Sequence, residues 1–337
     1  YSRNFQQNLI DHGVYPDGFE YLNGEMSALP DNWDNINQRL ARRRPSLSPS
    51  RFSNEDFRRF KRADTHASKE QAVTISVAPI IEGDFGDPKC LGGGYPFGNL
   101  AHLTDGTLAP AKPDRFYGAP PYQLHRQIRQ EISNQIIPLT QNNLPIVPNF
   151  FLEAKGPDRT PAVAERQACY DGALGARGIH ALQSYGQEKP AYDNNAYTIT
   201  STYASGQLKL YTTHLAKPRG PGFPHEYIMT QLKGWAMTSD PETFRQGASA
   251  YRNARDWAKE KRDELIRLAN ERHLDAHFQH NPGDQHFDDA HISTTSNNAE
   301  CQDMQLSSKP PTEDMEEEYH ILSRNQKRPR AGGCSFQ

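Results

Sequence analysis

The stretch PNFFLEAKGPDRTP, Pro148–Pro161, places an acidic and a basic side chain two residues apart directly after a run of apolar ones. Because successive side chains of a strand point to opposite faces, Phe151, Glu153 and Lys155 share one face and apolar residues occupy the other. We therefore expect a strand over Asn149–Lys155 with one face in the core. The other face is expected to be half-buried and charged, which costs free energy unless the charges are paired, hydrated or bound to a metal ion.

Helices are expected on both sides of this strand. Tyr122–Ile137 carries leucine and isoleucine at helical spacing, which predicts a helix before the strand. Ala162–Gly186 is rich in alanine and predicts a helix after it, although three glycines either weaken this helix or permit close packing. A long helix is expected to begin at Pro241, with Ser239 or Asp240 as its cap.

Further strands are predicted by alternating apolar and polar residues. The segments on either side of Ala204–Gly206 give the clearest hairpin signal in the chain, and Glu226–Trp235 is a candidate for another strand. Asp105–Gly106 suggests a tight hairpin turn that leads into a strand near Pro113–Tyr117. The triple glycine Gly92–Gly94 lacks the spacing and the trailing lysine of a phosphate loop, so it is interpreted as a turn.

The segment before these elements combines a helix signal with an ambiguous apolar run. Ser53 is a good N-cap for a helix that is expected to run to about Glu70. The β-branched, apolar run Ala72–Ile81 fits either a buried strand or an extension of the preceding helix, because periodicity does not separate the two.

Composition along the chain suggests three parts. We expect an Arg/Pro-rich N-terminal extension over residues 1–62, a folded domain over 63–275 and a polar, disordered tail over 276–337. The triplet Arg42–Arg44 suits nucleic-acid contact or nuclear import, while the simpler interpretation of the extension is a solvated arm packed loosely on the domain. Together with the basic stretch Lys327–Arg330, the triplet suggests nuclear residence.

The overall composition excludes several classes of protein. The hydrophobic content of 35% and the mean hydropathy of −0.86 are low, so part of the chain is expected to be unpacked. A net charge of −3 argues against a uniformly basic nucleic-acid coat but permits a local basic groove. The 4 cysteines form no CxxC pair, which argues against a zinc ribbon and a disulfide framework and favours an intracellular, reducing location. No run of apolar residues is long enough for a membrane span.

Glu153, Lys155 and the upstream Asp114 have side chains suited to metal-assisted hydrolysis. Two acids that end neighbouring strands suit Mg²⁺, which prefers carboxylate oxygens and keeps several waters. The ion polarises a phosphoryl oxygen and acidifies a water, while Lys155 steadies that water or the developing charge. This combination is typical of phosphodiester hydrolysis. The simpler alternative is an exposed Glu–Lys pair on an edge strand, because an E-x-K triplet is expected about once in a chain of this length.

Other candidate sites have less support. The histidines from His273 to His291 have ligand-like gaps, but they lack cysteines or acids in a compact unit. Cys169 lies on the alanine-rich segment and is interpreted as a small buried residue rather than a nucleophile.

The candidate residues occur in an order that resembles a known superfamily. The order is Pro113-Asp114, then Glu153-Ala154-Lys155, then Gln167 with Tyr170 on the next helix. It resembles the PD-(D/E)xK nuclease superfamily, which has the restriction-endonuclease-like fold. The longer strings GGGYPFGNL, FFLEAKGPD, RQACYDGALGARG and YDNNAYTITSTY look like an uncharacterised fungal domain family placed in that superfamily. The resemblance covers roughly residues 5 to 275.

This resemblance implies a fold and a metal site. The fold is α/β (α+β), with a four-stranded mixed sheet flanked by helices. Asp114 and Glu153 are implied to bind Mg²⁺ (or Mn²⁺), with the Ala154 carbonyl completing the coordination and Lys155 as the catalytic lysine. Many members add an acid from the helix before the first core strand, and Glu70 is the candidate here.

The helix after the lysine strand supplies one more candidate. Some exonuclease branches carry a Gln and a Tyr four residues apart at this place, and Gln167 is the matching catalytic candidate. Tyr170 follows it after only three residues, which departs from that pattern, so packing on the sheet is at least as good an interpretation for Tyr170.

The expected function is hydrolysis of phosphodiester bonds in nucleic acid, with DNA as the expected partner. The alternative is a catalytically inactive nuclease-fold domain that binds nucleic acid or protein through the basic segment Arg39–Arg62. The residues leave open DNA against RNA, endonucleolytic against exonucleolytic cutting, and the oligomeric state.

Overall fold

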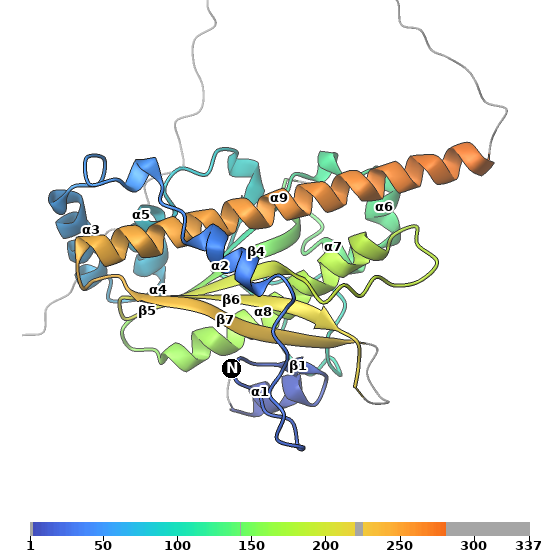
Figure 1. Ribbon diagram of the computed structural model, residues 1–337, viewed down its shortest axis with the longest axis horizontal. Coiled ribbons are helices and arrows are strands. Elements are labelled where there is room, and N and C mark those ends of the chain that lie inside the picture. The colour runs from blue at the N-terminus through green and yellow to red at the C-terminus, as the bar shows by residue number, and fades with distance from the viewer. Residues whose placement is uncertain (1–2, 142, 220–224, 281–337) are drawn as a thin grey trace, which may run out of the picture. The chain divides into compact units, whose positions relative to one another are not determined.

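A seven-stranded mixed sheet forms the centre of the molecule, as the computed structural model shows (Figure 1). The structure describes residues 3–141, 143–219 and 225–280. The strands follow the spatial order β1-β7-β6-β5-β4-β3-β2, and β4–β5 and β1–β7 are the parallel pairs. Their bounds are β1 Val14–Tyr15, β2 Leu91–Gly92, β3 Arg115–Ala119, β4 Ile146–Lys155, β5 Ala196–Ala204, β6 Gln207–Ala216 and β7 Glu226–Ala236.

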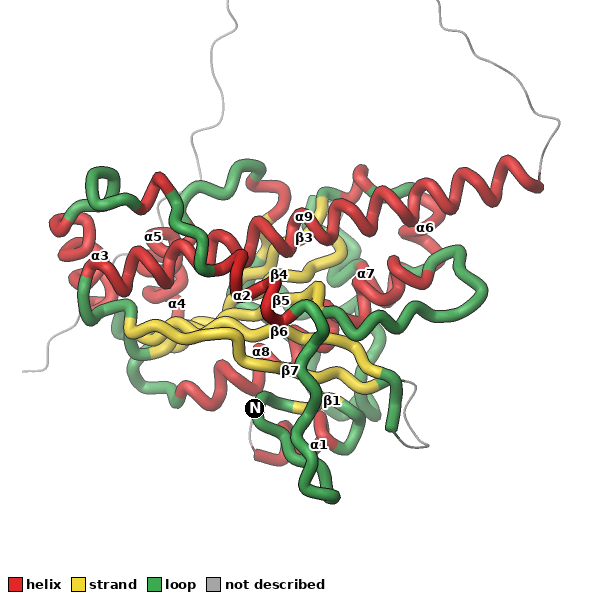
Figure 2. Tube along the Cα trace, viewed as in Figure 1, coloured by secondary structure: helices red, strands yellow, loops and turns green. Residues whose placement is uncertain are grey.

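Helices cover both faces of this sheet (Figure 2). Helix α8 lies on one face, and α9 with α2, α3 and α5 lies on the other, each enclosing its own apolar core. The helices are α1 Arg3–Ile10, α2 Trp33–Leu40, α3 Asn54–His66, α4 Glu70–Ala72, α5 Ala78–Glu82, α6 Arg126–Glu131, α7 Ser133–Ile136, α8 Pro161–Ser184 and α9 Pro241–His280. The expected α/β class with a mixed, helix-flanked sheet is confirmed. The sheet has seven strands rather than the four expected, because its centre has five strands, β3 to β7, and the two-residue strands β1 and β2 extend its two edges.

Strand β4, which contains Glu153 and Lys155, is central and entirely buried. Phe150 packs in the core under α9 and Phe151 in the core under α8, so the two faces alternate as predicted. The expectation of a half-buried, charged face is wrong, because Glu153 is 1% exposed and Lys155 3% exposed. The reason is that α8 lies directly over this face.

Glycines allow α8 to lie this close to the sheet. A Cβ atom on Gly172 would overlap the Thr213 hydroxyl, and one on Gly175 would lie 2.8 Å from the Phe151 ring. The helix nevertheless runs unbroken through these glycines. Of the two roles considered for them, close packing is therefore the one that the structure shows.

Several predicted boundaries are confirmed by local contacts. Ser53 forms a capping box with Asp56 at the start of α3. The Asp240 side chain accepts a hydrogen bond of 2.9 Å from the Thr243 amide, so Asp240 is the cap of α9. The β5–β6 hairpin turns at Ser205 and Gly206, both at positive φ.

Other predicted elements differ from the structure. The run Ala72–Ile81 is helical, since α4, a π-helical turn over Val73–Val77 and α5 follow one another, while α3 ends at His66. The helix expected over Tyr122–Ile137 is divided into α6 and α7 at Ile132, whose backbone is non-helical. The hairpin predicted at Asp105–Gly106 is wrong: these residues lie in a loop, and β3 pairs with β2 and β4.

The N-terminal segment contributes to the core. Val14 pairs with Tyr227 at the sheet edge, Ile36 is fully buried under α9, and Phe60 packs on Phe244. The residues set apart as an extension therefore belong to the same compact unit as the sheet, and a loosely packed arm is the wrong description.

The C-terminal part of the described chain is helical for longer than expected. Helix α9 continues to His280, five residues beyond the domain limit expected at 275. The rest of the expected disordered tail, including Lys327–Arg330, lies outside the described residues. Within the described part of the chain, none of the helices has the length and apolar character needed to cross a membrane.

Candidate functional site

The end of β4 and the residue before β3 form the centre of the candidate site. Antiparallel pairing of Arg115 with Leu152 places Asp114 beside the last residues of β4. The Asp114 Oδ2 atom accepts a hydrogen bond of 2.8 Å from the Ala154 amide. Two segments separated by almost forty residues are thereby joined next to Glu153.

Lys155 lies among three carboxylates from three separate segments. Its Nζ atom is 3.1 Å from Glu70 Oε2, 3.2 Å from Glu153 Oε2 and 3.6 Å from Asp114 Oδ2. The same atom donates a 2.8 Å hydrogen bond to the Ala154 carbonyl. The structure thus brings together the five residues predicted as metal ligands or catalytic lysine, and Lys155 points inward.

Burial and charge act in opposite directions on Lys155. Burial alone would lower the pKa of its ammonium group, but Glu153, Asp114 and Glu70 together raise this pKa above its usual value. Lys155 is therefore firmly charged and compensates part of the acidic cluster around it.

Two glycines bring the surrounding backbone close to these side chains. A Cβ atom on Gly93 would overlap the Asp114 carbonyl oxygen, and one on Gly156 would lie 2.9 Å from the Glu70 amide nitrogen. The triple glycine predicted as a turn thus begins as the short edge strand β2, and the turn follows at Gly94, which has positive φ. Because Gly93 has no side chain, its backbone can lie against the Asp114 carbonyl oxygen.

Helix α8 adds two further polar side chains, Gln167 and Asp171. They lie one helical turn apart on the face toward β4, and their residues are 8% and 1% exposed. The carboxyl groups of Asp171 and Glu153 are hydrogen-bonded to each other. Asp171 is not among the residues predicted from the sequence. The pattern that could have indicated it is the i, i+4 spacing from Gln167 on a helix face otherwise made of alanine and glycine.

The acids in this cluster hold protons more strongly than usual. Burial raises the pKa of Asp114 to about 6 and that of Asp171 to about 7. Burial, Asp171 and Asp114 raise the pKa of Glu153 well above its ordinary value. With Glu70, the cluster contains four carboxyl groups, three of which contact the Lys155 ammonium group.

The donor set suits a hard divalent cation, although the side chains are not arranged around one. Among residues 3–280 as described, no three His, Cys, Asp or Glu side chains converge on a common metal position. The Lys155 ammonium group lies between the carboxylates instead. Oxygens from Asp114, Glu153 and the Ala154 carbonyl are the ligand type that Mg²⁺ and Mn²⁺ prefer, so the residues present fit such an ion.

The cluster opens to the surface through two grooves that share Glu70. One has a volume of about 940 Å³ and is also lined by Asp114, Gln167 and Lys112. The other, of about 340 Å³, is also lined by Gly156 and Arg159. A ligand can therefore reach Glu70 from either groove.

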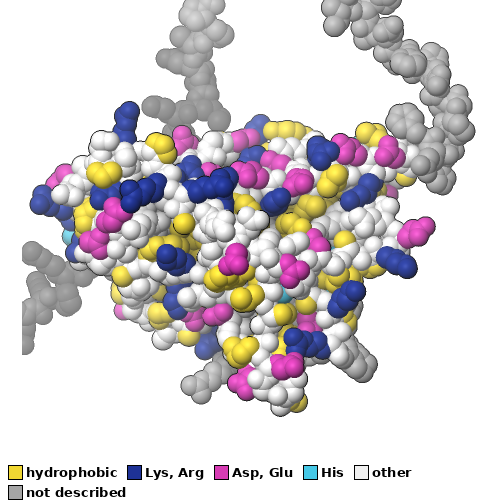
Figure 3. Space-filling model, viewed as in Figure 1, with side chains coloured by type: hydrophobic (Ala, Val, Ile, Leu, Met, Phe, Trp, Pro, Cys, Tyr) yellow, Lys and Arg dark blue, Asp and Glu magenta, His cyan; other side chains and the backbone are white. Residues whose placement is uncertain are grey.

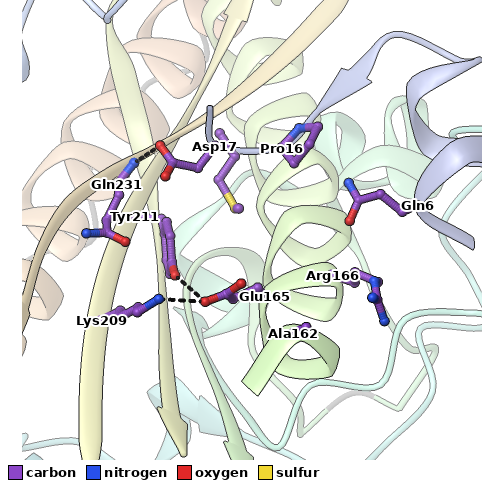
Figure 4. Close-up of a pocket in the computed structure, with 10 residues that line it drawn as sticks. Gln6, Pro16, Asp17, Ala162, Glu165, Arg166, Lys209, Tyr211 and Gln231 are labelled. Carbon is purple, nitrogen blue, oxygen red and sulfur yellow. Dashed lines mark hydrogen bonds and ion pairs between the residues drawn. The ribbon is translucent and has the colours of Figure 1, made fainter. Parts of the chain in front are cut away.

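A separate pocket of about 310 Å³ lies between the start of α8 and strands β6 and β7 (Figure 4). Lys209 donates a 2.7 Å hydrogen bond to Glu165, which also accepts one of 3.3 Å from the Tyr211 hydroxyl. Lys209 shares a cross-strand row with Thr202 and Glu153. Glu165 balances the charge of Lys209, so this ion pair adds no net charge to the pocket.

The remaining candidates from the sequence are structural. Tyr170 is 3% exposed and packs edge-on against Phe5. Cys169 is buried, and burial raises the pKa of its thiol to about 12, as expected for an inert residue. His273 and His277 contact each other, whereas His291 lies outside the described residues.

Comparison with known proteins identifies no relative. No protein-family model matches the chain, and no curated protein or solved structure shows significant similarity to it. The arguments about its function therefore rest on the geometry and chemistry of its own residues.

Proposed function

We propose that this protein is a metal-dependent nuclease of the PD-(D/E)xK type with the restriction-endonuclease-like fold. The observation that carries the proposal is the Lys155 ammonium group within 3.6 Å of Glu70, Asp114 and Glu153, at the meeting point of two open grooves. A mere exposed ion pair on an edge strand does not account for it, because β4 is central and both partners are buried.

Asp114, Glu153 and the Ala154 carbonyl would hold Mg²⁺ or Mn²⁺. The ion supplies charge stabilisation at a phosphoryl oxygen and lowers the pKa of a bound water. Lys155 neutralises the acids in the structure, and with a cation held there its Nζ would be free to donate a hydrogen bond to water or to a phosphate oxygen. Glu70, whose side chain is 42% exposed, lies at the surface end of the site and could pair either with Lys155 or with the cation.

Cations without protein partners support a phosphodiester substrate. Lys112 lines the larger groove, and Lys69 and Arg159 line the smaller one. Their exposed side chains make no hydrogen bond or ion pair with any of the described residues. Phosphates of a nucleic acid are suited to such contacts on both sides of a cleavage site, and we expect DNA to be the substrate.

The alternative, a binding module, would use the basic segment Arg39–Arg62. Lys and Arg side chains do gather over the start of α9 and the connection from α2 to α3, interleaved with acids (Figure 3). Many of the arginines are paired: Arg39 with Glu260, Arg44 with Asp256, Arg58 and Arg62 with Glu55, and Arg59 with Asp56. Of the other basic residues in this segment, Arg42 and Arg43 line a groove of about 610 Å³ with Lys233.

Cleavage assays with site variants separate the two functions. Plasmid and linear DNA are incubated with the protein and Mg²⁺ or Mn²⁺, beside Asp114→Ala, Lys155→Ala and the controls Glu188→Ala and Lys189→Ala. The controls remove exposed charges just beyond the far end of α8. We expect cutting to fall by roughly a hundredfold or more in the site variants and to persist in the controls. DNA retention without cutting in any sample would support the binding module instead.

A further inference from the structure

The larger groove beside the acid cluster has two exposed apolar side chains on its surface. Ile75 is 63% exposed and Tyr95 is 44% exposed. Both line the groove of about 940 Å³ that is also lined by Asp114 and Gln167. Single exposed apolar residues scattered over a surface are common, but a pair on one concave surface next to a polar site indicates a binding site.

Tyr95 lies on a turn that is anchored on both sides. The Gly94 amide donates a 2.9 Å hydrogen bond to the Pro113 carbonyl, and the Phe97 amide donates one of 2.8 Å to the Ala111 carbonyl. Within the part of the chain that the structure describes, the Tyr95 hydroxyl group has no hydrogen-bond partner and its ring packs on no other aromatic ring. The backbone is thus fixed while the ring is available to a ligand, which reduces the entropy lost on binding.

Ile75 comes from the π-helical turn that connects α4 to α5. Val73 and Val77, at the two ends of this turn, are buried in the core. Arg115 of β3 holds the turn through a 2.8 Å hydrogen bond to the Thr74 carbonyl. The exposed Ile75 side chain is therefore presented to the groove by a well-supported segment, and its truncation should leave the core intact.

The chemistry of these side chains favours unpaired bases over a duplex. A duplex offers phosphates and sugars to a protein groove, and the flat faces of its bases are stacked inside the helix. A single strand leaves its base faces free to stack on aromatic rings, while lysines contact its phosphates. Lys112, an exposed cation in the same groove, can make such a phosphate contact.

We propose that the larger groove binds single-stranded DNA, with a base stacked on Tyr95, apolar contact from Ile75 and a phosphate contact from Lys112. This inference rests on the proposed function, because it takes the groove to lead the strand to Lys155. It adds that the enzyme prefers single strands and frayed ends to intact duplex. Duplex DNA would be cut more slowly, since base pairs must open first at a cost of a few kcal/mol.

Binding is measured without metal, so that no cutting intervenes. The full-length protein in EDTA is titrated into end-labelled single-stranded DNA of about twelve nucleotides, and into the same strand annealed to its complement. Fluorescence anisotropy gives both affinities, and we expect the single strand to bind roughly tenfold or more tightly. A second single strand carries 2-aminopurine, whose fluorescence is quenched when the base stacks on a tyrosine ring.

Variants assign the contacts to individual side chains. Tyr95→Ala should weaken single-strand binding roughly ten- to a hundredfold and abolish the quenching, whereas Tyr95→Phe should retain both. Ile75→Ala should weaken binding several-fold, and Lys112→Ala should reduce the slope of log affinity against log salt by roughly 0.7. Tyr122→Ala is the matched control, because Tyr122 is a 70% exposed tyrosine outside both grooves, and it should bind like the wild type.

The outcomes separate this inference from the proposed function. Equal affinity for single strand and duplex, or equal binding by Tyr95→Ala and Tyr122→Ala, would overturn the single-strand groove. Cutting of both substrates is then followed with Mg²⁺. A wild type that cuts duplex as fast as single strands would leave the nuclease standing without this preference. Single strands that bind through Tyr95 but are never cut would support the groove and refute the nuclease.

Discussion

Lys155 illustrates how one residue sets both the stability and the charge balance of a buried cluster. A lysine that is 3% exposed is costly to bury, and here three carboxylates offset that cost. The acids in turn depend on the ammonium group, because their own burial raises the pKa of Asp114 and Glu153. Stability and protonation are therefore coupled at this position.

Replacement of this lysine should destabilise the fold in a pH-dependent way. Lys155→Met leaves buried carboxylates unpaired, and we expect the free energy of unfolding at pH 8 to fall by about 3–5 kcal/mol. The loss should shrink toward pH 5, because carboxyls with raised pKa values take up protons more readily folded than unfolded. Urea unfolding at both pH values measures this difference.

The matched control is Lys209→Met. Lys209 and Glu165 form an ion pair whose side chains are 38% and 34% exposed. Pairs accessible to solvent contribute at most about 1 kcal/mol, so this variant should change stability little at either pH. Equal effects of the two substitutions would show that Lys155 is not the charge on which the cluster depends.

Metal binding should follow the protonation of the same acids. Asp114, whose pKa burial raises to about 6, and Glu153, whose pKa lies well above its ordinary value, would have to release protons before binding the proposed cation. We expect Mn²⁺ affinity to rise by roughly one to two powers of ten from about pH 5.5 to pH 8, as measured by titration calorimetry. Affinity that is constant over this range would contradict a role for these carboxyls as ligands.

Among the elements, β4 and α8 make the site together. Strand alternation determines that Glu153 and Lys155 share a face, while α8 determines that this face is buried and adds Gln167 and Asp171 to it. The local pattern thus predicts the orientation of the strand side chains. It does not predict their environment, which depends on the element that packs across them.

The close approach of α8 gives a prediction at this scale. Ala is usually favoured over Gly within a helix by about 1 kcal/mol. Gly172→Ala should instead destabilise by about 1–3 kcal/mol, because the new methyl group would overlap Thr213. Gly98→Ala is the control, since a Cβ there meets nothing within 4 Å. Thermal unfolding compares the two, and a stabilised Gly172→Ala variant would show that α8 has room on the sheet.

At the scale of the whole molecule, the N-terminal segment completes the cores on which the site rests. Beta strand β1 adds to the edge of the sheet, and α2 and α3 cover the core under α9. Tyr203 at the end of β5 donates a 2.6 Å hydrogen bond to Asp64 of α3, and the chain then leads directly to Glu70 in the site. The basic composition of the segment predicted a solvated arm and gave no indication of this structural role.

Truncation of a core residue in that segment tests its contribution. Phe60 is fully buried, with ring centroids 4.4 Å from Phe244 of α9, and Phe60→Ala should lower the free energy of unfolding by about 3–5 kcal/mol. Leu22→Ala, at a fully exposed leucine, should stay within about 0.5 kcal/mol. If the two variants unfold alike, the segment would be dispensable for the fold.

The sequence by itself determined the features that depend on near neighbours. Alternation predicted the face shared by Glu153 and Lys155, and capping residues predicted the starts of α3 and α9. A short motif likewise indicated that Asp114 belongs beside them. These predictions succeed because backbone geometry links residues that are close in sequence, or because the motif itself names the residues.

Only the tertiary structure decided the rest. It made Ala72–Ile81 helical, placed the N-terminal segment in the core and brought Asp171 to Glu153. Each of these depends on which surfaces pack together across long stretches of chain. Burial by a distant element is also what raises the pKa values of the acids, and no local pattern carries that information.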